Sequence, residues 1–152
     1  MSAKVFFTDV EDGVVPVDCH EKVIQIAYIY MDAGLWIGNS IFDVVEKLHA
    51  RGWLFGKGKL RFNYSLDIFY LAQLAMAIYC FTNQLEGDFP NYPSPDDFHF
   101  FYTTYHTLLY FSVWCSYYSP VFLTQHTTAC FYRLPDLRDL PDSDSLLGLP
   151  RQ

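Results

Sequence analysis

The stretch that decides the fold spans residues 65 to 83 and reads SLDIFYLAQLAMAIYCFTN. Ser65 is a residue type that caps helices, so we predict a helix over Leu66–Asn83. This helix is apolar nearly all round, which is typical of the centre of a protein core. Its most apolar part, Ile68–Thr82, is shorter than a membrane span and lies beside Asp67, so we expect a buried helix.

Two further helices are predicted before this stretch. The first covers Cys19–Ala33 and has a capping-box arrangement that begins at Asp18. The second covers Ile41–Arg51 and is capped by Asn39 or Ser40. Their inward faces, at helical spacing, consist of Val23, Ile26, Ala27, Tyr30 and Met31 in the first helix and Ile41, Val44, Val45 and Leu48 in the second.

A fourth helix is predicted to start at Ser94-Pro95-Asp96-Asp97 and to end near Tyr118. A capping serine, a proline in the first turn and two carboxylates all suit the positive end of a helix dipole. The segment Val121–Tyr132 fits either a fifth helix or a strand, because its threonines and aromatic residues favour both.

Two segments have the character of β-structure. Lys4–Thr8 is predicted to form a short strand, followed by an acidic turn. Trp53–Tyr64 is predicted to form a β-hairpin that turns at Gly56-Lys57-Gly58, because apolar and polar residues alternate after the glycines. The expected fold class is therefore α+β and predominantly α, with four or five helices, one hairpin and a short N-terminal strand.

The length of 152 residues suits one domain with a substantial core. We assign residues 1–133 to a single globular domain and residues 134–152 to a flexible, disordered acidic tail rich in Pro, Ser and Leu. Within the tail, Asp142-Ser143-Asp144-Ser145-Leu146-Leu147 resembles the acidic dileucine sorting signal. The alternative is a solvated tail with incidental leucines.

The sequence predicts a soluble protein without a membrane span. Phe98–Tyr132 is free of Asp, Glu, Lys and Arg, but it holds three histidines and many tyrosines. The first residues have no secretory apolar region, so we expect a cytoplasmic setting, with a nuclear one as the alternative. The four cysteines lack the spacing of a metal site, and we predict buried free thiols, no metal and no cofactor.

The charges are distributed unevenly over a chain of net charge −7. Five of the ten basic residues lie in one acid-free window and form a predicted basic patch of Lys47, Arg51, Lys57, Lys59 and Arg61. This patch fits an acidic partner, or self-association against the acidic remainder of the chain. A helix followed by a basic hairpin also has the outline of a winged helix, although a pI near 5.0 makes nucleic acid a poor partner.

Aromatic residues are in surplus around the predicted fourth helix. The run consists of Phe98, Phe100, Phe101, Tyr102, Tyr105, Tyr110, Phe111, Trp114, Tyr117 and Tyr118. A single inward stripe would use about a third of these positions, so the remainder must meet another element, another subunit or a ligand. Tyr102, Tyr105 and His106 are the candidate lining of a pocket, in which His106 could perform acid–base chemistry.

The leading functional expectation is a non-enzymatic protein–protein interaction or adaptor module that self-associates. It would use a groove between aromatic helices together with the basic patch. The first alternative is a small enzyme or ligand-binding protein with a pocket lined by Tyr and His. The second is a winged-helix-like nucleic-acid binder. No residues have the spacing of a catalytic motif, so no catalytic residue is assigned; Cys115 or Cys130 with His126 is the weakest candidate pair.

Overall fold

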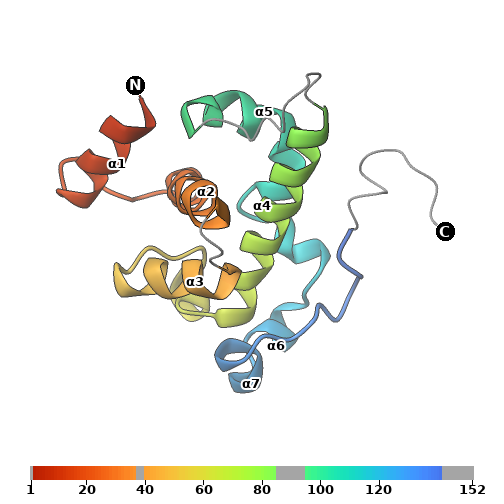
Figure 1. Cartoon of the computed structure of the whole chain (residues 1–152). Coiled ribbons are helices and arrows are strands. Elements are labelled where there is room, and N and C mark those ends of the chain that lie inside the picture. The colour runs from red at the N-terminus through yellow and green to blue at the C-terminus, as the bar shows by residue number, and fades with distance from the viewer. Residues whose placement is uncertain (1, 37–39, 85–94, 142–152) are drawn as a thin grey trace.

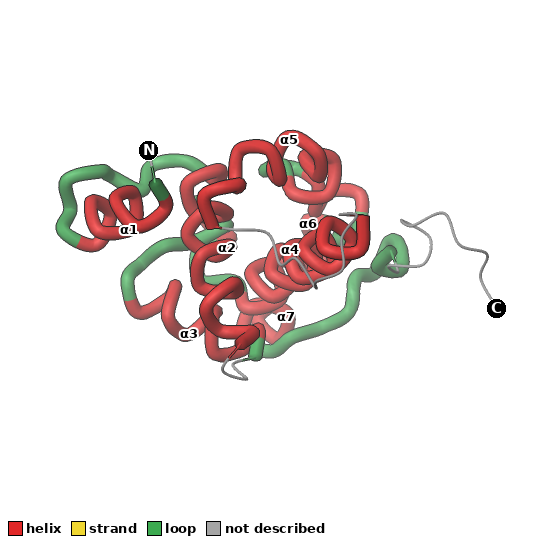
Figure 2. Tube along the Cα trace, turned by 45° about the horizontal axis from the view of Figure 1, so that its top comes forward, coloured by secondary structure: helices red, strands yellow, loops and turns green. Residues whose placement is uncertain are grey.

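The computed structural model describes residues 2–36, 40–84 and 95–141, and within them it is all-α (Figures 1 and 2). The α-helices are α1 (Ala3–Glu11), α2 (His20–Trp36), α3 (Ile41–Ala50), α4 (Tyr64–Gln84), α5 (Phe98–Leu109), α6 (Pro120–Leu123) and α7 (His126–Cys130). Three short 3₁₀ helices accompany them, at Gly58–Leu60, Pro95–Asp97 and Val113–Ser116. No strand occurs in these ranges, so the predicted α+β class is wrong.

Helix α4 is the centre of the fold, as predicted. It packs against α2, α3, α5 and α7, and it crosses the middle of the molecule in Figure 1. Its segment Tyr64–Phe81 is long and apolar enough to cross a membrane, but 72% of that segment is buried inside the protein. The buried side chains of α4 include Phe69, Tyr70, Leu71 and Leu74, each 0% exposed, which is the burial expected of a core helix.

The predictions for α2 and α3 are confirmed, with ends that differ by a few residues. Helix α3 begins with a capping box in which the Ser40 amide donates to Asp43 Oδ2 (2.7 Å) and the Asp43 amide donates to Ser40 Oγ (3.3 Å). Of the predicted inward residues, Val44, Val45 and Leu48 are buried. In α2, Val23, Ile26, Ala27 and Met31 are buried and Tyr30 is half-buried.

The predicted N-terminal strand is wrong, because Lys4–Thr8 belongs to helix α1. Ser2 caps this helix, its Oγ accepting from the Val5 amide at 3.2 Å. The buried residues Ala3, Phe6 and Val10 follow helical spacing and place one face against the protein. The β-branched and aromatic residues that suggested a strand find no neighbouring strand in the described residues, so packing overrides their propensity.

The predicted hairpin is also wrong: residues 51–63 form a loop, and Tyr64 already belongs to α4. Trp53 and Phe55 anchor this loop, being 9% and 7% exposed. The glycines lead into a single 3₁₀ turn instead of a strand-to-strand turn. Phe62 has a positive φ of 56°, which breaks the alternation, and its ring is 48% exposed. The wing of a winged helix is therefore absent from the described residues.

Asn63, not Ser65, caps α4. Its Oδ1 accepts from the Leu66 amide (3.0 Å), and its Nδ2 donates to Leu123 O (2.8 Å). This pair of bonds explains why a polar residue is 1% exposed at this position. Ser65 instead faces the C-terminal region, where its Oγ donates to Thr128 O (2.6 Å) and accepts from the Arg133 amide (2.9 Å).

The C-terminal region consists of short helices and an irregular segment. Helix α5 ends at Leu109, earlier than predicted, and Val121–Tyr132 contains helices and no strand. The first part of the predicted tail, residues 134–141, is fastened to the core by the Leu137 amide, which donates to Tyr117 O (2.9 Å), and by Asp136, which accepts from the Ser119 amide (2.8 Å). The dileucine-like motif lies outside the described residues.

Candidate functional site

The largest hollow described is a pocket of about 810 Å³ between the start of α2, the loop before α4, and the segment from α5 to Trp114. We call it the aromatic pocket. Its lining consists of Cys19, His20, Glu21, Phe55, Gly56, Lys57, Leu60, Leu66, Tyr102, His106, Tyr110, Phe111, Ser112, Trp114 and Cys115. Rings and aliphatic groups dominate, with a few polar groups among them, which is the usual make-up of a small-molecule site.

The aromatic wall of the pocket is one stripe of α5 and its continuation. Tyr102 and His106 lie one turn apart on α5, on either side of a kink at Tyr105, and Tyr110 is the extended residue that follows the helix. The His106 ring meets Tyr102 edge-on (5.6 Å between centroids) and stacks on Tyr110 (5.5 Å). Phe111 and Trp114 extend the wall beyond the end of the helix.

The end of α5 and the two residues after it are held by core side chains that donate to their carbonyls. A helix leaves its last four carbonyls without helical partners, and buried ones need others. The contacts are Gln73 Nε2 to Leu108 O (3.4 Å), His20 Nε2 to Leu109 O (2.6 Å), and Tyr70 Oη to Tyr110 O (3.0 Å) and Phe111 O (2.7 Å). Burial raises the pKa of Tyr70, so its hydroxyl stays protonated and remains a donor.

The loop wall faces the aromatic wall and is held mainly by packing. The Phe55 ring stacks on Tyr70, with centroids 5.2 Å apart and planes at 21°. Gly56 allows a close approach of two backbone segments, because a Cβ built there would lie 2.0 Å from Leu60 O. Only glycine fits at this position, and the turn that brings Lys57 to the pocket depends on it.

A pair formed by a half-buried imidazole and a buried carboxyl group joins the two helices that flank the loop wall. His49 on α3 contacts Asp67 Oδ2 on α4, and Asp67 is 1% exposed. Burial raises the pKa of Asp67, and the contact with His49 opposes that rise. The other oxygen, Oδ1, is buried without a hydrogen-bond partner in the described part of the chain, so His49 is the main compensation for this carboxyl group.

His20 stands at the junction of the walls. Its ring lies against Tyr70 (4.7 Å) and Phe55 (5.8 Å). The short contact to the Leu109 carbonyl requires a proton on Nε2, so Nδ1 of the neutral ring is an acceptor. Burial lowers the pKa of His20, which favours this neutral form. Nδ1 is itself buried and has no hydrogen-bond partner among the described residues.

A smaller hollow of about 230 Å³ adjoins the aromatic pocket, and we call it the basic pocket after Lys57 and Arg61. The two pockets share five lining residues: Cys19, His20, Phe55, Gly56 and Lys57. Asp18 also lines the basic pocket, but its carboxylate is bound to Lys22 (2.9 Å). Lys57 therefore lies between the aromatic pocket and a smaller pocket that contains a second cation.

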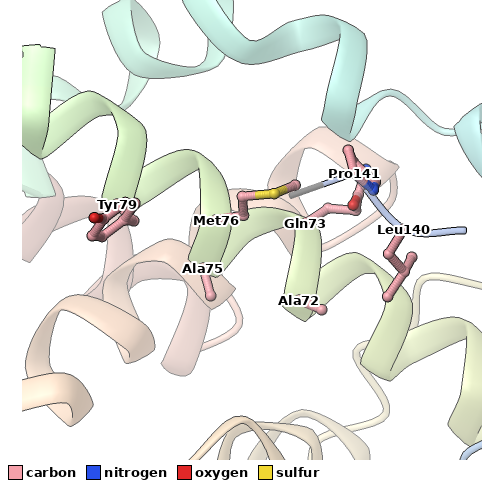
Figure 3. A pocket seen from close by; sticks show the side chains of 7 residues that line it. All are labelled: Ala72, Gln73, Ala75, Met76, Tyr79, Leu140 and Pro141. Atoms are coloured by element: carbon pink, nitrogen blue, oxygen red, sulfur yellow. The ribbon is translucent and has the colours of Figure 1, made fainter. Parts of the chain in front are cut away.

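A third hollow of about 440 Å³ runs along the outer face of α4. Figure 3 shows Ala72, Ala75, Met76 and Tyr79 on the helix, with Leu140 and Pro141 of the C-terminal segment at one end. Among the described residues that line this hollow, none is charged, and Gln73 alone has a side-chain amide. It offers less for recognition than the aromatic pocket.

The structure brings two of the three predicted pocket residues to the aromatic pocket. Tyr102 and His106 line it. Tyr105 lies on the adjacent face of α5, is 7% exposed and packs against Phe81 and Phe101 in the core. The lining residues that the sequence did not assign to a pocket lie outside α5. For Tyr110, Phe111 and Trp114, membership of the aromatic run is the one feature of the sequence that points to such a role.

The predicted basic patch falls into three groups. Arg51 is engaged within the protein, 3.5 Å from Glu11 and 4.6 Å from the Trp53 ring. Lys57 and Arg61 line the basic pocket. The remaining two are exposed, and of these Lys47 lies over the Tyr30 ring at 5.5 Å while Lys59 lies outside the lining of the pockets described here.

The cysteines are free, but only Cys80 is buried, so the prediction of buried thiols is wrong for the other three. Cys19 and Cys115 line the aromatic pocket. Cys130 Sγ lies 3.7 Å from both ring nitrogens of His126, and equal distances do not align a thiol with either lone pair. No cluster of three potential metal-ligating side chains occurs in the described residues.

The chain matches no protein-family model, and no curated protein or solved structure is detectably similar to it. Function is therefore argued from the geometry of the pockets.

Proposed function

We propose that this protein binds a small organic molecule with an aromatic or flat apolar body in the aromatic pocket. One observation carries the proposal. Four rings of the aromatic run that lie outside the core, Tyr102, Tyr110, Phe111 and Trp114, gather around a single hollow. Such a concentration of partly exposed rings is favourable when another apolar body covers them.

The dimensions of the pocket support a small ligand. Drug-sized molecules occupy hollows of about 300 to 1,000 Å³, and the pocket of about 810 Å³ lies in that range. Its polar groups are few and come from separate elements: Lys57 from the loop, Glu21 from α2 and His106 from α5. Such an arrangement can orient a ligand through two or three specific contacts.

Calorimetry with 2-naphthol, a neutral two-ring probe, tests the proposal. Phe111→Ala should weaken binding about three- to tenfold, because it removes one ring contact at small cost to the fold. Phe111 is 70% exposed. Phe131→Ala is the matched control, since Phe131 is 68% exposed and lies outside the pocket lining. Absence of binding, or equal effects of the two substitutions, would contradict the proposal.

Thiol labelling gives a second, independent readout. Saturating 2-naphthol should slow the alkylation of Cys19 and Cys115, which line the pocket. Cys130 is exposed on α7 and serves as the control inside the same molecule. Uniform slowing of all three, measured by peptide mass spectrometry, would indicate general surface binding.

A protein–protein interaction role is a second candidate. It is supported by exposed rings outside the aromatic pocket, at Phe42, Phe62 and Phe100, which are 51%, 48% and 64% exposed. If this role operates through self-association, the solution mass should exceed that of a monomer and fall when Phe42 and Phe62 are replaced by Ser. The winged-helix alternative is not carried further, because the hairpin on which it depended is a loop and a helix start.

A further inference from the structure

We infer that the ligand of the aromatic pocket is an organic anion, with its ring body in that pocket and its carboxylate or phosphate head in the adjoining basic pocket. This inference rests on the proposed function and specifies the chemical class of the ligand. It follows from three features: the shared wall of the two pockets, the charges around the smaller one, and an unsatisfied group between them.

The shared wall makes the two hollows one site with two compartments. Five residues line both hollows, and they include His20, Phe55 and Lys57. The larger compartment carries most of the rings, and the smaller one, although it also has apolar lining residues, holds Asp18, Lys57 and Arg61. A molecule with an apolar body and a compact polar head matches this division.

The charges of the smaller compartment favour an anionic head. Lys57 and Arg61 both line it, and Lys57 forms no salt bridge within the described residues. The acid of this compartment, Asp18, is already bound to Lys22, and this hydrogen bond lowers the pKa of Asp18. Two cations thus face a space whose one carboxylate is already compensated, and guanidinium and ammonium groups bind carboxylate and phosphate oxygens well.

The second acid of the site, Glu21, belongs to the aromatic compartment. Glu21 lines the aromatic compartment and not the basic one. Its charge adds to the effect of burial in raising the pKa of Tyr102 on the aromatic wall. Glu21 therefore disfavours an anion near Tyr102 and helps to orient the head group toward Lys57.

His20 has an unsatisfied acceptor in the shared wall. Its Nε2 proton is donated to Leu109 O, and its buried Nδ1 has no partner in the part of the chain described. Because Nδ1 is closed off from the pocket space, a head group that carries its own O–H, as a hydroxy acid or a singly protonated phosphate does, would supply the missing donor after a small movement of the ring. A carboxylate alone would bind the two cations and leave Nδ1 unsatisfied.

The experiment compares three probes with the same ring body by calorimetry on the full chain at low salt. These are 2-naphthol, 2-naphthoate and 2-naphthyl phosphate. We expect the two anions to bind about fivefold more tightly than 2-naphthol, because a partly exposed ion pair contributes a gain of this size. A further gain of the phosphate over the carboxylate would identify a phosphate-type head.

The decisive variants are Lys57→Gln and Arg61→Gln, with Lys59→Gln as the matched control. Lys57, Lys59 and Arg61 are all exposed, but Lys59 lines neither compartment. The gain of the anions over 2-naphthol should disappear in the first two variants and persist in the third. The binding of 2-naphthol itself should stay unchanged in Arg61→Gln and Lys59→Gln, because neither residue lines the aromatic pocket. Thermal unfolding of each variant checks that the fold is retained.

The outcomes separate this inference from the proposed function. If 2-naphthol binds and responds to Phe111→Ala, but the anions bind no more tightly, the anion inference is overturned and the pocket proposal survives. If Lys59→Gln removes the gain as fully as Lys57→Gln does, the effect belongs to the overall charge and the inference is again overturned. If none of the three probes binds, both proposals fail.

Discussion

The two walls of the aromatic pocket are built on different principles. The aromatic wall is a helix and its end, and core side chains such as Tyr70 and His20 hold it by donating to backbone carbonyls. The loop wall has one 3₁₀ turn and depends on a glycine, on packing of Phe55 and on the His49–Asp67 pair beneath it. The comparison teaches that the aromatic wall takes its residue spacing from a helix and its place from contacts 40 and 89 residues apart, whereas the loop wall depends on individual contacts closer in the chain, such as His49–Asp67 at 18 residues.

The largest effect should come from the pair beneath the loop wall. His49→Ala leaves the Asp67 carboxyl group buried without its partner, and loss of one member of a buried pair costs about 3 kcal/mol or more. Urea unfolding at neutral pH measures the loss. His99→Ala is the control, because His99 is an exposed histidine near the start of α5. A loss below about 1 kcal/mol would mean that the loop wall does not depend on this pair.

A smaller effect is expected where the loop wall approaches its own backbone. Gly56→Ala places a Cβ 2.0 Å from Leu60 O, which a side-chain rotation cannot relieve, and overpacking of this kind costs about 2 kcal/mol. Gly58→Ala is the matched comparison: it meets no atom within 4 Å and suffers only from the positive φ of 59°. Its cost should be about 1 kcal/mol. Thermal unfolding measures both losses, and a larger loss of stability in Gly58→Ala than in Gly56→Ala would contradict this account.

The aromatic wall should be less sensitive to a single change, because several donors share the task. Tyr70→Phe removes the hydroxyl that reaches Tyr110 O and Phe111 O, and we expect a loss of about 1.5 kcal/mol. The affinity for 2-naphthol should fall with it, since the two residues so held line the pocket. Tyr64→Phe is the control, because Tyr64 is a half-buried tyrosine at the start of α4. Neither the stability nor the affinity for 2-naphthol should change appreciably in this variant.

The smallest effect concerns pH. Burial lowers the pKa of His20 below its ordinary value of 6.5, so below pH 6.5 the unfolded chain takes up a proton more readily than the folded one. Stability contributed by neutral His20 is therefore complete above pH 6.5 and is lost as the pH falls below it. His20→Gln keeps a donor for Leu109 O but cannot titrate. The difference in the free energy of unfolding between the native chain and His20→Gln should become smaller from pH 7 to pH 5. A difference that does not change with pH would contradict a neutral, buried His20.

The sequence predicted helices α2, α3 and α4 better than the loop wall, for a physical reason. Helices α2, α3 and α4 have apolar periodicity and capping residues, which are local signals. Residues 53–64 alternate as a strand does, yet Asn63 gains more by capping α4 and reaching Leu123 than by pairing in a hairpin. That gain depends on a residue 60 positions away and leaves no local pattern.

The candidate site shows the same limit. Tyr102 and His106 could be assigned because a pocket lined by one helix face repeats every three or four residues. Tyr105 is in the core and not in the pocket, because a run of aromatic residues does not show which face of the helix packs against the core. His20 and Phe55 enter the pocket through tertiary packing alone, and nothing near them in the chain indicates it.

The bonds at the first turn of α4 have a consequence for how the protein is made. Asn63 and Ser65 find their partners at Leu123 and Thr128, 60 and 63 residues further along the chain. A ribosome adds about 5 to 20 residues each second, so the acceptors of these two polar groups are synthesised several seconds after the groups themselves. The central helix can coil early, but its first turn can be sealed into the interior only when translation has passed the second of those acceptors.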